Sequence, residues 1–391
     1  MNSSLVRTFV LPFFLLLACS DKPSAETKPS ILTERPQEGL PELTLFLAGK
    51  HPVDDTRYGK IAKTPGYAAY KKQLEGIWST YSKDFTAPLT EWRNQNVRDV
   101  NWDVVFYPFA GPDFPNANTV YPNGKTYIMV GLEPAGGIPE FEKMSDKKVM
   151  AELNRMLASV DYVSRRTYFI TSFMNQGYII TEGVAPVLLM YLGMLDYIPY
   201  SVKPIDLNEK GEVKYLTPED VKQYRAAKKW PSVEVKYQAT VGQPLKTIYY
   251  FKQDVGDEAM QKDPRLLTYL NSLPDYASVF KAASYLIHYE TFSKIADLVV
   301  NKSQIIVMDD TGPRAKILSP RFDLQVFGRY GRPIYPFQSQ YQTDLVKLYK
   351  EQKPEPIKFR YGYGGADGSR GIILATRKAA PSNLKPEAKA E

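Results

Sequence analysis

The sequence is poor in the residues that build disulfides and Cys/His metal clusters. Cys19 is the only cysteine among the 391 residues, and His51 and His288 are the only histidines. One cysteine forms no disulfide within a chain, and a zinc cluster of Cys and His ligands is excluded because the ligands are too few. The apolar run Phe9–Ala18 contains Pro12 and is shorter than the roughly 20 residues that span a bilayer.

Concentrated positive charge is also missing. The formal net charge is +7, and it becomes +6 once Arg7 is removed with the N-terminal segment. The basic residues cluster no further than the pairs Lys71-Lys72, Lys147-Lys148, Arg165-Arg166 and Lys228-Lys229. Nucleic-acid-binding proteins gather such charge on one face or stripe, so we expect no nucleic-acid partner.

The N-terminus has the layout of a secretory signal, with Arg7 before the apolar run. The run ends Leu16-Leu17-Ala18-Cys19, which resembles the lipobox of bacterial lipoproteins. This resemblance implies that residues 1–18 are removed and that Cys19 is lipidated, so that a membrane becomes a partner through the acyl chains. Ser20 after the cysteine resembles the signal for sorting to the outer membrane, in the envelope of a bacterium.

Composition divides the remaining chain into three parts. Residues 19–42 are polar and Pro-rich, which predicts a disordered tether. Residues 43–377 form one predicted domain, and residues 378–391 form a disordered tail. The alternating pattern of residues 198–254 predicts two hairpins, as an antiparallel insertion or cap.

Hydrophobic spacing predicts an α/β fold. We expect three layers, with N-terminal helices and a mostly parallel central sheet that carries the antiparallel insertion. The predicted helices are 67–81, one from Ser145, 184–195, 276–299 and 341–350, and the predicted strands are 104–107, 127–132, 304–308, 357–361 and 371–377.

Polar residues follow three of the predicted strands. The segments are Tyr107–Asp113, Gly131–Gly137 and Asp309–Arg314. Because ligands in α/β sheets bind beyond the carboxyl ends of the strands, we expect these segments to converge on a cleft. The candidate cleft residues are Asp113, Glu133, Asp309, Asp310 and Arg314.

Each candidate also has a structural interpretation. Asp113 after Gly-Pro can close a turn, and Glu133 can be a buried partner of Arg314 or Arg321. Only one of Asp309 and Asp310 faces the cleft if the chain is extended there. His288 is more typical of a satisfied core or rim histidine, and the glycine-rich segment 362–368 indicates a hairpin turn rather than a phosphate loop.

Four motifs resemble an uncharacterised family of bacterial lipoproteins: Phe109–Phe114, Gly131–Pro134, Ala283–His288 and Asp309–Pro313. The turn after Tyr107, with Glu133 placed 22 positions after Gly111, also resembles the nucleotide-binding half of methyltransferases. The turn lacks the further glycines of that fingerprint, so the second resemblance implies a related fold without transferase activity.

These observations predict a membrane-anchored envelope lipoprotein that binds a ligand or associates with the envelope. The alternative is a hydrolase or transferase that uses the cleft carboxylates, with or without a divalent cation on oxygen ligands. The sequence identifies no catalytic residue and no cofactor.

Overall fold

The two apolar runs at Val104 and Thr126 form neighbouring parallel strands in the middle of a ten-stranded sheet. In the computed structural model, β1 is Val104–Tyr107 and β2 is Thr126–Gly131, with Val104 opposite Thr126. The structure describes residues 35–50, 52–166, 183–227 and 229–379, and all of them belong to one unit of the chain. His51, the predicted signal and Cys19 lie outside the described residues.

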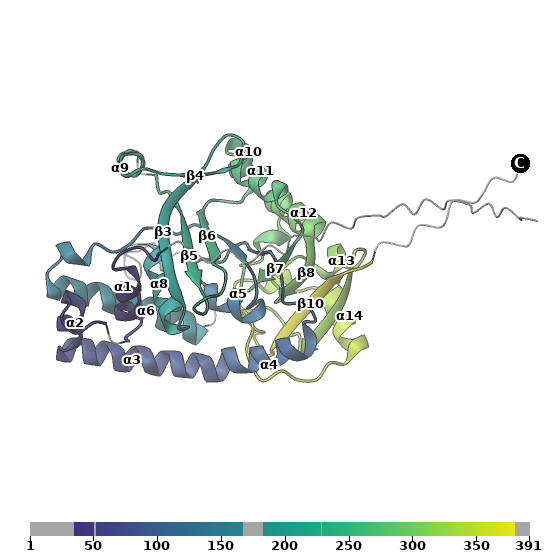
Figure 1. The fold of residues 1–391 in the computed structure, drawn as a ribbon. Helices are drawn as coiled ribbons and strands as arrows, with labels where there is room; N and C mark the ends of the chain where they lie inside the picture. The colour runs from purple at the N-terminus through teal and green to yellow at the C-terminus, as the bar shows by residue number, and fades with distance from the viewer. Residues whose placement is uncertain (1–34, 51, 167–182, 228, 380–391) are drawn as a thin grey trace, which may run out of the picture. The chain divides into compact units, whose positions relative to one another are not determined.

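The sheet has the order β4-β3-β5-β6-β2-β1-β7-β8-β10-β9 (Figure 1). The five strands from β6 to β8 are parallel, and both flanks are antiparallel. The α/β class is therefore confirmed, with a mixed sheet. The other strands are β3 (Ile198–Leu207), β4 (Val213–Tyr215), β5 (Ser232–Gln238), β6 (Lys246–Lys252), β7 (Tyr276–Phe280), β8 (Ser303–Met308), β9 (Phe322–Gly328) and β10 (Gly371–Arg377).

Helices precede, separate and follow the strands. The α-helices are α1 (Leu40–Leu47), α2 (Arg57–Ala62), α3 (Pro65–Tyr81), α4 (Ala87–Asn96), α5 (Phe114–Val120), α6 (Asp146–Arg166), α8 (Val184–Met194), α9 (Pro218–Ala226), α10 (Asp257–Lys262), α11 (Arg265–Ser272), α12 (Ser293–Lys302), α13 (Ala315–Leu318) and α14 (Thr343–Gln352). A π-helical turn, Ser82–Thr86, joins α3 to α4, and short 3-10 turns lie at Phe141–Lys143, Leu286–His288, Glu290–Phe292 and Gln338–Gln340.

Local chemistry explains where the helices begin. The Thr64 side chain accepts a hydrogen bond from the Tyr67 amide, and Pro65 occupies the first turn of α3, where no amide donor is needed. Thr217 and Asp220 form a reciprocal capping box at the start of α9.

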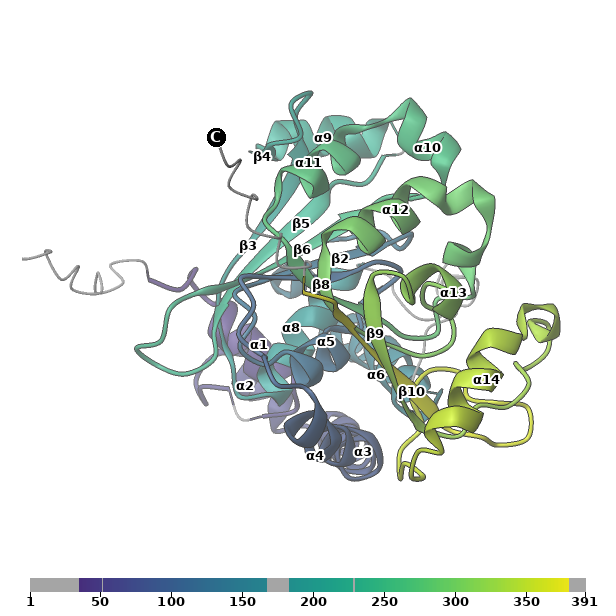
Figure 2. The ribbon, with the colours of Figure 1, turned by 90° about the vertical axis from the view of Figure 1, so that its right-hand side faces the viewer.

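Alternate side chains of the central strands belong to two separate hydrophobic clusters. On β1, Val105 and Tyr107 belong to the cluster that includes α1, α3 and α8, whereas Val104 and Phe106 belong to the cluster that includes α11 and α12. Two perpendicular views place α3 and α4 below the strands and α10 to α12 above them (Figures 1 and 2). The central strands are thus buried on both faces, as their unbroken apolar runs predict.

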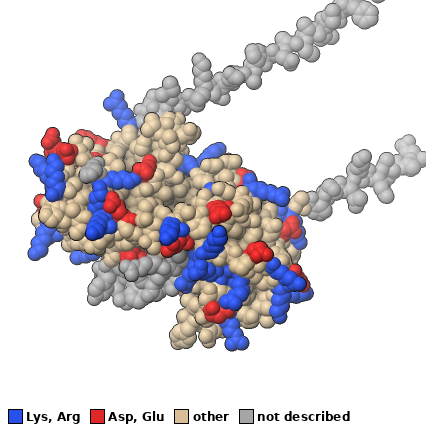
Figure 3. Space-filling view, turned by 90° about the horizontal axis from the view of Figure 1, so that it is seen from below, with Lys and Arg blue, Asp and Glu red and all other residues tan. Residues whose placement is uncertain are grey.

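Charge on the surface is mixed. Lys, Arg, Asp and Glu side chains are interspersed on the face seen from below, with a denser group of basic side chains at the lower right (Figure 3).

Two predicted elements are wrong. Residues 276–299 are not one helix, because Tyr276–Phe280 form β7 and helix α12 begins only at Ser293. All five β7 side chains are buried, so the segment has no strand alternation and its apolar residues match helical spacing by coincidence. Residues 357–361 form no strand. Strand β9, which was not predicted, pairs with β10 instead.

The two hairpins predicted within residues 198–254 are present as β3–β4 and β5–β6, and they extend the sheet rather than cap the domain, because β6 pairs in parallel with β2. Two further expectations need correction. The predicted tether ends too late, since the Gln37 amide donates to the Tyr200 carbonyl and buried Leu40 begins α1. The predicted tail begins too early, because Lys378 still bonds to the Arg321 carbonyl.

Candidate functional site

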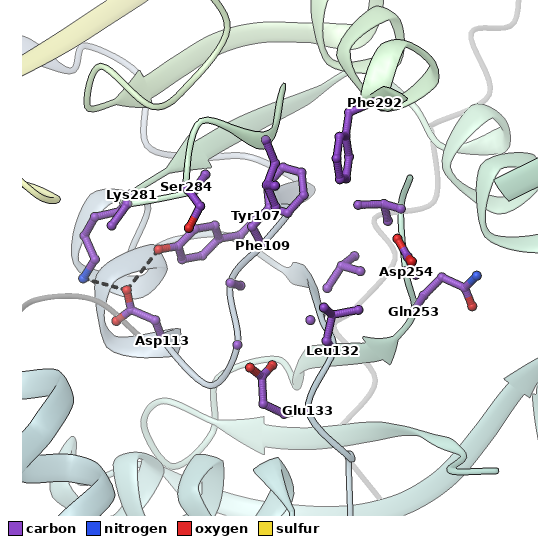
Figure 4. Close-up of a pocket in the computed structure, with 18 residues that line it drawn as sticks. Tyr107, Phe109, Asp113, Leu132, Glu133, Gln253, Asp254, Lys281, Ser284 and Phe292 are labelled. Atoms are coloured by element: carbon purple, nitrogen blue, oxygen red, sulfur yellow. Dashed lines mark hydrogen bonds and ion pairs between the residues drawn. The ribbon is translucent and has the colours of Figure 1, made fainter. Parts of the chain in front are cut away.

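A cavity of about 120 Å³ lies at the carboxyl ends of four neighbouring strands, β6, β2, β1 and β7 (Figure 4). The residues that follow each strand supply its lining. Phe109 and Asp113 come after β1, Glu133 after β2, Asp254 after β6 and Lys281 after β7. The cavity is therefore built by segments that are far apart in the sequence.

The strand order makes this position a switch point of the sheet. From β1 the chain continues to β2 on one side, whereas β7 pairs with β1 on the other side and continues to β8. Loops that leave neighbouring strands in opposite directions open a crevice, and ligands of open α/β sheets bind there.

Backbone strain is concentrated in the loops around the cavity. Phe109, Ala282 and Ser284 line it and have positive φ angles of 59°, 52° and 52°. Each such residue costs on the order of 1–3 kcal/mol and persists only where its surroundings hold it. Asp309 provides one restraint, because its Oδ2 atom accepts a hydrogen bond of 2.9 Å from the Ala282 amide. Strain of this kind is typical of ligand sites.

A buried ion pair forms one end of the cavity. Lys281 Nζ lies 2.6 Å from Asp113 Oδ2, and the two side chains are 0% and 3% exposed. Tyr107 Oη donates to the same oxygen at 3.0 Å, and the ammonium lies 4.9 Å from the centre of the Phe85 ring. Burial raises the pKa of Asp113, and the charge of Lys281 opposes that increase.

This ion pair is incompletely hydrogen-bonded. Asp113 Oδ1 and Lys281 Nζ are buried, and neither makes a hydrogen bond of regular geometry with the described residues. The close approach of Lys281 to Asp113 is thus an ionic contact rather than a well-directed hydrogen bond. A buried polar atom without a hydrogen bond costs about 1–3 kcal/mol.

Glu133 contributes a second buried carboxylate, with 3% of the residue exposed. Tyr250 Oη contacts its Oε2 atom at 3.1 Å and its main-chain oxygen at 3.0 Å. Gly131 makes this arrangement possible, since a Cβ atom there would lie 2.6 Å from both Oε2 and the Tyr250 hydroxyl. The predicted partners Arg314 and Arg321 contact Gln340 and Asn301 instead.

Asp309 and Asp310 do not line the cavity, which corrects the predicted three-segment cleft. Asp309 accepts hydrogen bonds from the Ala282 and Thr311 amides, and Asp310 accepts one of 2.6 Å from Tyr285. Burial raises the pKa of Asp309 to about 6, and burial with the charge of Asp309 raises that of Asp310 to about 7. Through these hydrogen bonds to Ala282 and Tyr285, the two aspartates support the loop after β7 from outside the cavity.

Arg314 and His288 also lie outside the cavity lining. One His288 nitrogen contacts the Gly312 carbonyl at 2.7 Å and the other contacts Gln340 at 3.2 Å, which fits the structural interpretation of this histidine. Burial lowers the pKa of His288 to about 4. Arg314 contacts the same Gln340 oxygen at 3.2 Å.

The glycine-rich segment 362–368 is not a hairpin between two strands. A single bridge joins Pro333 to Gly365. Gly362 lies against Asp309, where a Cβ atom would be 1.7 Å from Oδ2. This segment therefore packs against the residues that hold the strained loop.

The sequence prediction missed Lys281 and Asp254. Lys281 directly follows the apolar run Tyr276–Phe280, and a charged residue after a buried run is the signal for a strand end. The predicted helix over residues 276–299 places no strand end at Lys281, so this signal does not appear in the prediction. Asp254 follows β6 in the same way.

The titratable side chains of the described lining are carboxylates, a lysine and a tyrosine. No group of three or more His, Cys, Asp or Glu side chains in the described part of the chain is placed to hold a metal ion. Ser284 Oγ contacts Tyr363 Oη at 2.9 Å, and the lining includes no imidazole that would activate it.

Comparison with known proteins identifies no relative of the chain. No protein-family model, no curated protein and no solved structure matches the chain. Among the described helices, none is long and apolar enough to cross a membrane.

Proposed function

We propose that the protein is a lipid-anchored envelope protein whose domain binds a small molecule in the cavity beyond β6, β2, β1 and β7. The observation that carries the binding function is the position of this cavity at the switch point between β1 and β7. The strained loops at Phe109 and Ala282 support it.

We also propose that the domain has three layers. The two hydrophobic clusters support a three-layer arrangement, with helices on both faces of the sheet. Without the antiparallel strands β3 to β5, the remaining seven strands, numbered along the chain, have the order 3-2-1-4-5-7-6. Doubly wound nucleotide-binding sheets have the order 3-2-1-4-5-6, and this likeness is an analogy of fold.

The ligand that we propose carries no phosphate. In nucleotide-binding sheets of this kind, the N-terminus of the helix after the first strand holds a phosphate. Here Asp113 directly precedes α5 and its buried carboxylate is paired with Lys281. A phosphate at this position would compete with the Asp113 carboxylate for the positive charge of Lys281.

A hydrolase or transferase is the second candidate. It would use the lining carboxylates Asp113, Glu133 or Asp254 as its acid and base, since Asp309 and Asp310 lie elsewhere. Asp113 is engaged by Lys281 and Tyr107, and Glu133 by Tyr250, so the contacts favour binding over catalysis.

Attachment to the outer membrane through Cys19 is a proposal that rests on the lipobox resemblance of Leu16–Cys19 and on Ser20. By the same reading, residues 1–18 are removed. The tether is then the segment between Cys19 and Gln37, where the first main-chain contact with β3 occurs.

A binding screen on the full chain with a variant that blocks the cavity tests the function. Leu132 lines the cavity but is 46% exposed, so Leu132→Trp should fill the opening with little effect on folding. Val241→Trp is the matched control, because Val241 is 78% exposed in the turn between β5 and β6. We expect small molecules that stabilise wild type and the control against thermal unfolding but not Leu132→Trp. If every binder stabilises all three proteins equally, the cavity is not the binding site.

A further inference from the structure

We propose that the cavity is selective for a small organic cation, a protonated amine with a short apolar tail, whose charge is neutralised by Glu133. This inference rests on the proposed binding function of the same cavity and adds the chemical class of its ligand. It follows from the charges of the lining, the contacts of Glu133 and the position of the aromatic rings.

The lining has more negative than positive groups. Among the described residues it includes the carboxylates of Asp113, Glu133 and Asp254 and one ammonium, that of Lys281. Lys281 is committed to Asp113, 2.6 Å away. Two carboxylates therefore remain without a basic partner in the lining, and the cavity favours a positively charged ligand.

Glu133 is the carboxylate that most needs such a ligand. It is 3% exposed, and the partner that the structure gives its carboxylate is the neutral hydroxyl of Tyr250. Its oxygens point toward the middle of the cavity, whereas the Lys281 ammonium lies beside Asp113 (Figure 4). A buried carboxylate is costly without a counter-charge, and an ammonium group supplies both charge and strong hydrogen bonds.

Aromatic and aliphatic side chains complete the complementarity. Phe109 and Phe292 lie edge to face with their ring centres 5.9 Å apart, and Leu132 lies between them and Glu133 in the close-up (Figure 4). Aromatic faces attract cations, and the three side chains offer an apolar surface for a hydrocarbon tail. An anionic ligand would gain the same apolar contacts but would meet the carboxylates.

Three probes of nearly equal shape separate charge from apolar contact. Isopentylamine is a cation at neutral pH, isopentanol is neutral and isovalerate is an anion. Their dissociation constants for the full chain are measured by calorimetry with wild type, Glu133→Gln and Glu91→Gln. Glu91 is exposed on α4 and does not line the cavity, so it is a matched control.

We expect wild type to bind isopentylamine at least about tenfold more tightly than isopentanol, because a hydrogen bond between charged groups is stronger than one between neutral groups. Isovalerate should bind most weakly. Glu133→Gln should remove the preference for the amine and keep the binding of the alcohol, whereas Glu91→Gln should keep both. If Glu133→Gln does not fold, Asp254→Asn, at an exposed position of the same lining, should lower the preference about two- to threefold.

The possible failures are distinguishable. If isopentanol or isovalerate binds as tightly as the amine and Leu132→Trp abolishes that binding, the cation proposal is overturned and the binding function stands. If none of the probes binds and the wider screen also yields no ligand sensitive to Leu132→Trp, both are overturned. A preference for the amine that survives in Glu133→Gln would also contradict the assignment of the charge to this residue.

Discussion

Lys281 Nζ lies 2.6 Å from Asp113 Oδ2, and this ion pair joins the loop after β7 to the loop after β1. The two residues are 168 positions apart in the sequence, yet their strands are neighbours in the sheet. The contact thus fixes the width of the cavity on the side where the strand order reverses.

Removing one partner of this pair should be far more costly than removing both. Lys281→Met leaves a buried carboxylate without its counter-charge, and we expect a loss of about 3–5 kcal/mol in the free energy of unfolding. The double variant Lys281→Met with Asp113→Asn should recover most of that loss, because buried pairs can often be replaced at little cost. Denaturant unfolding of the two single variants and the double variant measures the coupling. Simple addition of the two single losses would show that the residues do not interact.

Gly362 should be intolerant of any side chain. Both Gly362 and Gly368 have positive φ angles, 67° and 75°, so alanine is strained at either position. A Cβ atom at Gly362 would collide with Asp309, whereas none of the surrounding atoms lies within 4 Å of one at Gly368. We expect Gly362→Ala to lower the free energy of unfolding by about 2 kcal/mol more than Gly368→Ala, within the range for overpacking. Equal losses in chemical unfolding would contradict this contact.

The stability of the protein should depend on the protonation of Asp309 and Asp310. Their pKa values in the folded state are raised to about 6 and about 7, above the ordinary value near 4. Their contribution to stability is therefore full below about pH 4 and is lost as the pH rises to about 7. His288, with a pKa lowered to about 4, has the opposite effect over part of this range, so the total slope mixes both.

A difference measurement separates these contributions. Asp310→Asn keeps His288 and removes one carboxylate, so its stability relative to wild type should increase from pH 4 to pH 7. Each proton taken up on folding changes the free energy by about 1.4 kcal/mol per pH unit. Thermal or urea unfolding at several pH values gives the difference. A difference that does not change with pH would mean that Asp310 titrates normally in the folded protein.

The central part of the fold could be predicted from the sequence because burial on both faces leaves a plain signal. β1 and most of β2 and β8 are apolar runs, α3 and α8 begin and end close to the predicted residues, and α6 begins close to the predicted start at Ser145. The sequence also predicted that Asp113 and Glu133 converge on a cleft beyond strand ends, and both line the cavity.

The other parts depend on pairing between distant segments, which local patterns do not contain. Residues 276–280 match a helix by spacing, and their burial as β7 is decided by β1 and β8 on either side. A helix over residues 276–299 gives Lys281 no position at a strand end, so the sequence does not predict it in the lining. Asp309 and Asp310 follow β8 but lie outside the lining, which includes Lys281. The partner of Glu133 was missed for the same reason, because Tyr250 lies on β6, 117 positions away.

Attachment to the membrane should require Cys19. Cys19→Ser removes the thiol that would accept lipid, so we expect the protein in the soluble fraction or as a larger, uncleaved precursor. Ser20→Ala keeps the cysteine and should remain with the membrane fraction. Fractionation and gel mobility report both results. A Cys19→Ser protein that fractionates and migrates like wild type would show that the resemblance to a lipobox is misleading.

The most direct measurement is an experimental structure of the protein with isopentylamine. The account predicts the amine inside the cavity, with its nitrogen about 3 Å from a carboxylate oxygen of Glu133 and its tail against the apolar surface of Phe109, Phe292 and Leu132. The ion pair of Asp113 and Lys281 should remain in place beside it. Amine bound only outside this cavity, or a cavity without amine at a saturating concentration, would contradict the account.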